Sequence, residues 1–95
     1  MQNMDIHFEL NGDLFVWSEN KADTNWRKHG VRFEEAATVF EDPFFVLVDA
    51  SRNDESRDAA IGFDATGRLL LSYILSSRHR LFESFPSGVQ NQMRS

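Results

Sequence analysis

Apolar and polar residues alternate at the start of the chain, where residues 6–10 read Ile-His-Phe-Glu-Leu. A period of two is typical of a strand with one buried face. Asn11 and Gly12 follow, and a second apolar run occupies residues 14–17. Asn-Gly between two such runs favours a tight hairpin turn, because both residues tolerate a positive φ. We therefore expect a β-hairpin over residues 4–17.

The period then changes to that of helices. Ser18 can cap a helix over residues 19–28, and Gly30 supplies the left-handed residue that commonly ends one. A second helix is predicted over residues 33–40, where apolar side chains recur at i, i+3, i+4 and i+7. Pro43 stops it, because proline lacks an N–H donor and disfavours helix in the residue before it.

Three strand-like runs follow, at residues 44–48, 57–63 and 68–75. Their connections are too short for crossovers, so they should form an antiparallel meander. Residues 81–85 have the composition of a further short strand, whereas residues 86–95 show no usable period. We expect one domain over residues 1–85 and a disordered tail over residues 86–95. The predicted fold class is α+β, with a small antiparallel sheet and two N-terminal helices.

Composition narrows the function classes. The 95 residues carry a formal net charge of −5, which argues against strong intrinsic affinity for nucleic acid but leaves room for a local basic site. The chain has no cysteine, so it has neither a disulfide nor a thiolate metal site. Its apolar runs are too short to span a bilayer, and charged residues interrupt any signal peptide near the start. We expect a cytoplasmic protein without membrane contact.

Two residues at the end of the first predicted helix have the chemistry for proton transfer and phosphate binding. His29 belongs to the residue type most easily tuned near neutral pH, and Lys28 beside it would stabilise negative charge on phosphorus. The simpler interpretation is that both complement the helix dipole and that His29 packs beside Trp26. Taken by themselves, these residues favour the simpler interpretation.

A second basic set lies at the ends of the later strands and in the turn that follows them: Arg57, Arg68, Arg78, His79 and Arg80. In an antiparallel pair, Arg57 and Arg78 would meet at one sheet edge and Arg68 would lie at the other. Arginine binds phosphate through two parallel hydrogen bonds, so a cleft with Arg57, Arg78 and His79 would bind an RNA backbone and transfer a proton. For any single arginine, a solvated turn is the simpler interpretation. The histidines lack metal-ligand spacing, so no metal or cofactor is predicted.

Several short motifs keep a fixed order along the middle of the chain. They are Trp-Ser-Glu-Asn-Lys-Ala at residues 17–22, Asn25, Lys-His-Gly-Val at 28–31, Phe-Glu-Glu-Ala at 33–36, Val-Phe-Glu-Asp-Pro at 39–43, Arg57, Ala-Ile-Gly at 60–62 and Gly-Arg-Leu-Leu at 67–70. In this order they resemble the BrnT family, the ribonuclease toxins of bacterial type II toxin–antitoxin pairs.

The resemblance implies a compact fold related to the RelE-type ribonucleases and metal-independent cleavage of RNA, which arrests translation. It also implies neutralisation by a BrnA-type antitoxin, with DNA contacted only through that antitoxin. Carried over by position, the catalytic residues are Lys28, His29, Arg57 and Arg78, and the RNA-binding residues are Arg68, His79 and Arg80.

The C-terminus departs from that family, which usually closes with a strand like Arg-Ile-Ile-Ser-Ala-Arg and a basic helix. Residues 81–90 read Leu-Phe-Glu-Ser-Phe-Pro-Ser-Gly-Val-Gln instead. A shifted reading frame can spell the missing motif in its place, so a frameshift near Arg80 is our hypothesis. Loss of the closing arginines favours an alternative function, a catalytically impaired module that only docks an antitoxin. An unpaired sheet edge around residues 68–75 would favour a dimer or a heterocomplex.

Overall fold

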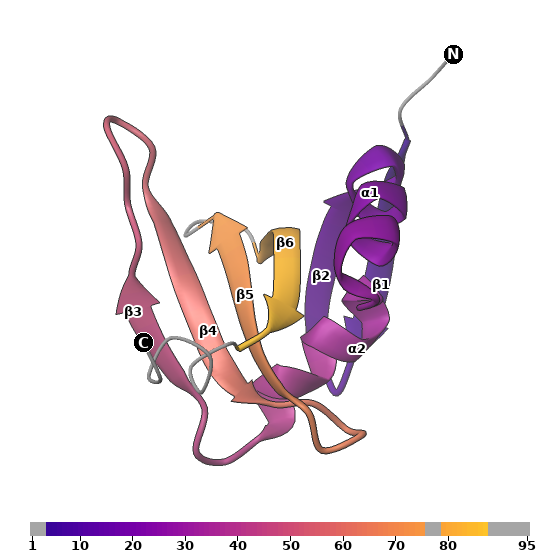
Figure 1. Ribbon diagram of the computed structural model, residues 1–95, viewed down its shortest axis with the longest axis vertical. Coiled ribbons are helices and arrows are strands. Elements are labelled where there is room, and N and C mark those ends of the chain that lie inside the picture. Colours follow the sequence, from indigo (N-terminus) through magenta and orange to yellow (C-terminus); the bar gives the residue numbers. More distant parts are fainter. Residues whose placement is uncertain (1–3, 76–78, 88–95) are drawn as a thin grey trace.

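The computed structural model describes residues 4–75 and 79–87, and within them one six-stranded sheet is covered by short helices (Figure 1). The strands are β1 (Asp5–Leu10), β2 (Asp13–Ser18), β3 (Val46–Asp49), β4 (Arg57–Phe63), β5 (Leu69–Leu75) and β6 (Arg80–Pro86). Between β2 and β3 come α1 (Glu19–His29), α2 (Phe33–Ala37) and the 3₁₀ helix η1 (Thr38–Glu41). The strand order is β1-β2-β6-β5-β4-β3, so the last strand of the chain lies in the middle of the sheet. Helices α1 and α2 lie on the side of β1 and β2 in Figure 1.

The predicted N-terminal hairpin is confirmed. Strands β1 and β2 are antiparallel, with Ile6 opposite Trp17. Asn11 and Gly12 form the turn with φ values of 50° and 88°, as a two-residue hairpin requires. The inner face of β2 belongs to the core, since Phe15 and Trp17 are each 1% exposed.

Helix α1 begins where the sequence predicts and extends one residue further. The Ser18 hydroxyl accepts the Lys21 backbone N–H at 3.0 Å, which is the expected cap. Gly30 has φ 67° and donates its N–H to the Trp26 carbonyl at 2.9 Å. Trp26, on the same helix, lies outside the core. Its side chain is 45% exposed, and the Arg32 guanidinium lies 4.2 Å above its ring.

The second predicted helix is shorter than expected, because its last turn tightens into η1. Thr38 stands at the junction. Its hydroxyl donates to the Glu35 carbonyl at 2.6 Å and accepts the Ala65 N–H at 2.8 Å. A threonine that bonds the backbone in this way competes with regular helical hydrogen bonds. The apolar stripe still packs as predicted, with Phe33 buried and the ring of Phe40 5.3 Å from that of Phe15.

The predicted meander is also confirmed, since β3, β4 and β5 pair in sequence order as antiparallel neighbours. Strand β6 extends it on the other side of β5. A register shift between Tyr73 and Ile74 marks a bulge in this pair. A bulge breaks the period of two, which is why residues 81–85 carry only a weak strand pattern.

The predicted fold class is wrong in two respects, although the α+β class in general holds. First, the sheet is mixed, because β6 runs parallel to β2, with Val16 opposite Arg80. Second, the helices follow a hairpin rather than opening the chain. The parallel pair arises because β6 reverses direction after β5 and inserts beside β2, where Leu81 becomes fully buried.

This insertion also changes the predicted edge. Strand β5 has a neighbour on each side, and the outer strands of the described sheet are β1 and β3. Strand β6 reaches Pro86, after which the Ser87 N–H donates to the Leu69 carbonyl at 2.7 Å. The rest of the predicted tail, residues 88–95, lies outside the described residues, as does Arg78.

Candidate functional site

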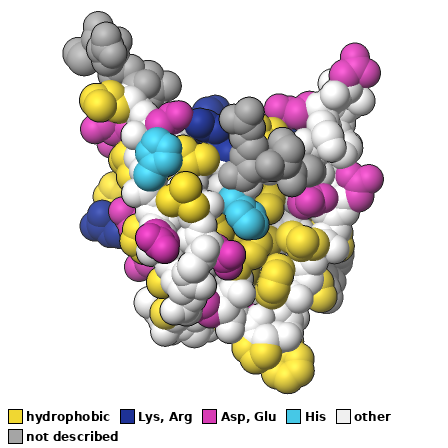
Figure 2. All heavy atoms as spheres, turned by 180° about the vertical axis from the view of Figure 1, so that it is seen from behind, with side chains coloured by type: hydrophobic (Ala, Val, Ile, Leu, Met, Phe, Trp, Pro, Cys, Tyr) yellow, Lys and Arg dark blue, Asp and Glu magenta, His cyan; other side chains and the backbone are white. Residues whose placement is uncertain are grey.

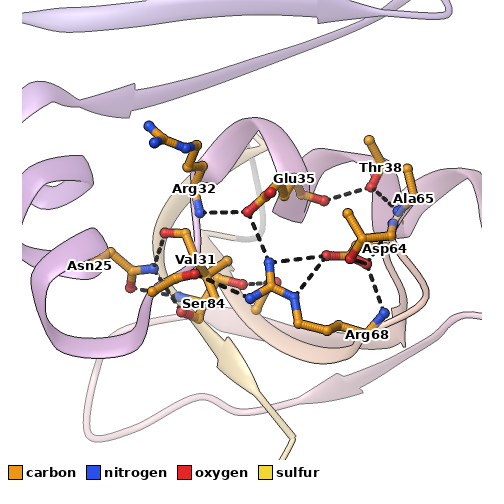
Figure 3. A network of polar contacts seen from close by, with 12 residues as sticks. Asn25, Val31, Arg32, Glu35, Thr38, Asp64, Ala65, Arg68 and Ser84 are labelled. Carbon is orange, nitrogen blue, oxygen red and sulfur yellow. Dashed lines mark hydrogen bonds and ion pairs between the residues drawn. The ribbon is translucent and has the colours of Figure 1, made fainter.

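Helix α1 packs against strand β6, beside the part of its edge that β2 leaves unpaired, and this contact positions the candidate site. Strands β2 and β6 pair only through Val16 and Arg80 in the described register, so the rest of that β6 edge needs another partner. Asn25 supplies it (Figure 3). Its amide nitrogen donates to the Ser84 carbonyl at 2.7 Å, and its amide oxygen accepts the Ser84 N–H at 2.9 Å. The same nitrogen donates to the Val31 carbonyl at 3.1 Å, and Asn25 is 3% exposed. The Asn25 side chain therefore satisfies the two Ser84 backbone groups that a neighbouring strand would otherwise satisfy.

The last turn of α1 consequently lies against β6, and two of its three basic residues, Lys28 and His29, meet one carboxylate. The Oε2 atom of Glu83 is 3.0 Å from His29 Nε2 and 4.0 Å from Lys28 Nζ. The three side chains differ in exposure, with Lys28 at 62%, Glu83 at 34% and His29 at 22%. The site thus combines a mostly buried imidazole with an exposed ammonium group.

Aromatic rings extend the site from His29 across the sheet. The imidazole centroid lies 5.2 Å from the ring of Phe85, which in turn lies 6.0 Å from Tyr73. Tyr73 stacks on Phe82 with an interplanar angle of 19° and a centroid distance of 5.8 Å. These rings are half-buried on the described surface. Their faces are suited to stacking with a nucleobase.

Arg57 stands at the far end of the same row of rings. Its guanidinium carbon is 4.8 Å from the Tyr73 centroid and 5.4 Å from the Phe82 centroid. Its Nε donates to the Ala50 carbonyl at 2.8 Å, and one terminal nitrogen is 3.7 Å from the exposed carboxylate of Glu55. The protein therefore orients the planar fork of this side chain, which is 15% exposed, and a fork of this kind is suited to bind a phosphate.

A pocket of ≈ 210 Å³ lies between α1 and β6. It is lined by Lys21, Thr24, Asn25, Lys28, His29, Phe82 and Glu83. Phe82 and Tyr73 thus link two parts of the predicted site. Lys28 and His29 lie at one end of this surface, and Arg57 lies at the other. Hereafter the candidate site means Lys28, His29, Arg57, Tyr73, Phe82, Glu83 and Phe85.

Arg68, the first predicted RNA-binding residue, lies in a different setting (Figure 3). It donates to the Gly30 carbonyl at 3.1 Å, to Glu35 Oε1 at 2.9 Å and to Asp64 Oδ2 at 3.3 Å. These bonds join the end of α1, helix α2 and the turn before β5. We call Arg68, Asp64 and Glu35 the structural corner.

Asp64 carries the charge of this corner in a buried position, with a side chain that is 0% exposed. Burial by itself would raise the pKa of the carboxyl group. Hydrogen bonds from the Thr66 hydroxyl and from the backbone N–H groups of Arg68 and Thr66, together with the Arg68 charge, nevertheless keep that pKa below its ordinary value. Among the described residues, no buried side-chain nitrogen or oxygen lacks a hydrogen-bond partner.

The remaining predicted residues lie around the start of β6. Arg80 forms a two-pronged ion pair with Asp5, at 2.6 and 3.2 Å, which lowers the pKa of the Asp5 carboxyl. His79 has φ 50°, and its ring lies 5.3 Å from Phe15 and 6.0 Å from Phe40. Neither residue has a contact with the candidate site in the described part of the chain. Their predicted roles in RNA binding stay predictions.

The face seen in Figure 2 has a different character. Acidic side chains are scattered over it, and apolar side chains gather towards its middle and lower part. This distribution agrees with the net charge of −5. Carboxylates repel phosphates, so this face is poorly suited to an RNA backbone.

A family model for the ribonuclease toxin BrnT of type II toxin–antitoxin systems matches residues 17–81. The chain belongs to the BrnT family. No curated protein matches it in the corresponding search. Among the described residues, no helix is long and apolar enough to cross a membrane, and no group of three or more His, Asp or Glu side chains is placed to hold a metal ion.

The BrnT match divides the candidate site. It includes Lys28, His29, Arg57 and Tyr73, and it ends at residue 81, before Phe82, Glu83 and Phe85. Sequence reasoning missed Tyr73 and these three residues. For the three on β6, the bulge in the β5–β6 pair hides the strand period. A strand pattern in which one extra residue is inserted, as in a bulge, would have fitted the aromatic and charged residues after Leu81 and was the available signal.

Proposed function

We propose that this BrnT-family chain is a metal-independent endoribonuclease that cleaves RNA in the cytoplasm and thereby arrests translation. The observation that carries the proposal is the continuous surface that joins His29, Lys28 and Arg57 through stacked rings. A proton-transfer group, two phosphate-binding cations and base-stacking rings are the parts that RNA cleavage without a metal requires.

In the proposed reaction, the ribose 2′-oxygen attacks the neighbouring phosphorus. A 2′-O–P bond forms and the P–O5′ bond breaks, which leaves a 2′,3′-cyclic phosphate and a 5′-hydroxyl end. The 2′-hydroxyl proton passes to water, and His29 donates a proton to the leaving 5′-oxygen. Lys28 binds the phosphate oxygens and offsets the charge that develops on them, while Arg57, at the far end of the row of rings, binds a neighbouring phosphate of the RNA backbone.

Rings of the candidate site would hold the RNA next to this phosphate. Tyr73 and Phe85 lie between His29 and Arg57, so a base stacked on them would bring its own backbone within reach of both ends of the site. Stacking is tolerant of sequence, because every base has a π face. It therefore contributes binding and orientation rather than a strict sequence preference.

A type II toxin has an antitoxin as its partner, and we propose that this partner is of the BrnA type and carries the DNA contact. The outer strand β3 supports such a heterocomplex. Its residues Val46, Leu47 and Val48 are 50%, 50% and 44% exposed, and its outer edge lacks a strand neighbour in the described sheet. Exposed apolar edges of this kind attract a further strand or helix.

A second candidate function has one observation in its favour. Glu83 faces both Lys28 and His29, and its negative charge weakens their attraction for phosphate. A chain disabled in this way would dock an antitoxin without cleaving RNA. The alternative is therefore a BrnT-derived binding module.

Inducible expression in bacteria separates the two functions. The ribonuclease causes growth arrest and loss of RNA, and His29→Ala abolishes both. Arg27→Ala is the matched control, since Arg27 precedes the site on the same helix turn and its side chain is 70% exposed. Normal growth and intact RNA with the unaltered chain would support the binding module instead.

A cleavage assay with purified protein tests the metal dependence. We expect equal rates in EDTA and in magnesium, and a 2′,3′-cyclic phosphate at the new RNA end. Activity that disappeared in EDTA and returned with magnesium would contradict the proposed mechanism.

A further inference from the structure

Glu83 lies at the point where two basic residues of the candidate site converge. A single oxygen, Oε2, is 3.0 Å from His29 Nε2 and 4.0 Å from Lys28 Nζ. The other line of evidence is the pocket, which Lys28, His29 and Glu83 all line. The carboxylate therefore lines the same cavity as the two basic side chains, and it comes from the β6 side.

We propose that Glu83 is an internal anion that occupies the phosphate position of this site, so that RNA must displace its carboxylate before cleavage. The inference rests on the proposed ribonuclease function and adds a residue to it. Carboxylate and phosphate oxygens accept the same N–H groups, and both are attracted by Lys28 and His29. The position of Oε2 therefore marks where a phosphate oxygen would bind.

Hydrogen-bond chemistry explains why the contact blocks proton transfer. An ionised carboxylate has no proton to donate, so the imidazole must donate from Nε2. A nitrogen engaged in this way cannot give its proton to a leaving oxygen of the RNA. As long as Glu83 stays in place, His29 presents no free proton-transfer group at Nε2.

Displacement is feasible because the pair is partly solvated. Glu83 is 34% exposed and Lys28 is 62% exposed, and ion pairs at this level of exposure are weak. A phosphate of RNA is part of a longer backbone. Contacts of that backbone to Arg57 would offset the loss of the Glu83 contact. Glu83 also lies beyond residue 81, where the family match ends, so that match does not include the blocking group.

Binding of inorganic phosphate tests the inference without relying on catalysis. Binding is followed through the NMR signals of the His29 ring in the full chain and in Glu83→Gln. Glutamine keeps an oxygen that can accept the His29 N–H but removes the charge. We expect phosphate to bind the variant about fivefold more tightly, with the largest effect at low salt.

Controls separate this local effect from a change in net charge. Glu9→Gln removes the same charge from an exposed position on the outer strand β1, and it should leave phosphate affinity within about twofold of the unaltered chain. Glu83→Thr provides a second variant with good strand propensity if the glutamine variant folds poorly. Unchanged or weaker phosphate binding in a folded Glu83 variant overturns the inference.

RNA cleavage by the same proteins distinguishes this inference from the proposed function. Tighter phosphate binding without any cleavage would support the role of Glu83 and reject the ribonuclease. Cleavage by the unaltered chain, with phosphate affinity unchanged in Glu83→Gln, would support the ribonuclease and reject the internal anion. If both hold, Glu83→Gln lowers KM for RNA about fivefold.

Discussion

Arg57 and Arg68 lie at comparable strand positions, yet the fold uses them differently. Arg68 donates to two carboxylates and a carbonyl of the structural corner, and these acceptors tie three segments together. Among the described residues, Arg57 has one side-chain hydrogen bond, from its Nε to the Ala50 carbonyl, and a 3.7 Å ion pair with Glu55, while its plane rests on two aromatic rings. An arginine whose donors are taken up by the protein stabilises the fold. One that is oriented by fewer hydrogen bonds and lies against aromatic rings is better suited to bind a ligand.

The same contrast separates Asn25 from Lys28, which are three residues apart on α1. Asn25 is buried and satisfies both backbone groups of Ser84, whereas Lys28 is mostly exposed and has one distant carboxylate partner. A helix can therefore complete the sheet with one face and present a site with its last turn. The first role is tested by stability and the second by RNA cleavage.

The largest expected effect is on stability, from Asn25→Ala. The change removes three buried hydrogen bonds and leaves the N–H and carbonyl groups of Ser84 without partners. We expect the free energy of unfolding to fall by about 3–4 kcal/mol, measured by urea denaturation. In a domain of this size, such a loss can prevent folding altogether.

Two further variants keep this prediction testable. Asn25→Asp retains an oxygen for the Ser84 N–H but loses the donor, so its loss should be smaller if the carboxylate is tolerated. Thr24→Ala is the neighbouring exposed control and should change stability by less than about 0.5 kcal/mol. A loss below about 1 kcal/mol in Asn25→Ala would mean that α1 does not depend on this bond to hold β6.

The second prediction compares the two arginines directly. Arg57→Ala should slow RNA cleavage at subsaturating RNA about 100-fold, equivalent to about 2.7 kcal/mol, because it removes an oriented cation that binds the RNA backbone. Arg68→Ala should leave the cleavage rate per folded molecule nearly unchanged while lowering the free energy of unfolding by about 2 kcal/mol. Rates are compared at a temperature where both variants are fully folded. Equal loss of cleavage in both would show that Arg68 also contacts RNA.

These assignments show what the sequence could and could not predict. The hairpin, the boundaries of α1 and the β3–β5 meander follow from local signals: an Asn-Gly turn, a serine cap and runs of strand-forming residues. The place of β6 depends on a long-range choice of partner, and its bulge removes the period that would have indicated a strand. A mixed sheet was therefore beyond the reach of local patterns.

Only part of the candidate site was predicted, again because the rest depends on the long-range position of β6. Lys28, His29 and Arg57 stand out by residue type, and the family resemblance added weight to each. Their connection runs through Tyr73, Phe82 and Phe85, which look like ordinary core residues until the strand order is known. Nor does an arginine's residue type reveal whether its donors are used up, so the sequence could not indicate that Arg68 belongs to the structural corner.

The third prediction concerns acid. The pKa of the Asp64 carboxyl is lowered in the folded protein, so the unfolded chain binds its proton more readily. The stability that Asp64 contributes is therefore present above its unfolded pKa and is lost as the pH falls through the folded pKa. Asp64→Asn should cost about 1–2 kcal/mol at pH 7, and this difference from the unaltered chain should shrink below about pH 4. A difference that stayed constant from pH 7 to pH 3 would exclude a role for the Asp64 charge.

The smallest expected effect comes from the glutamates that pair with the two compared arginines, Glu55 with Arg57 and Glu35 with Arg68. Glu55 is 55% exposed and 3.7 Å from Arg57, so solvent screens most of its charge. Glu55→Gln should raise RNA cleavage at subsaturating RNA by less than about twofold and should not change stability measurably. Glu35 is 32% exposed, lies 2.9 Å from Arg68 and also accepts the Arg32 N–H, so Glu35→Gln should lower the free energy of unfolding by about 1 kcal/mol. The pair of variants is compared in 50 mM and 300 mM salt, because only a screened surface charge loses its effect at the higher concentration. If Glu55→Gln changed cleavage tenfold at both salt concentrations, Arg57 would be as firmly paired as Arg68, and the distinction between the two regions would fail.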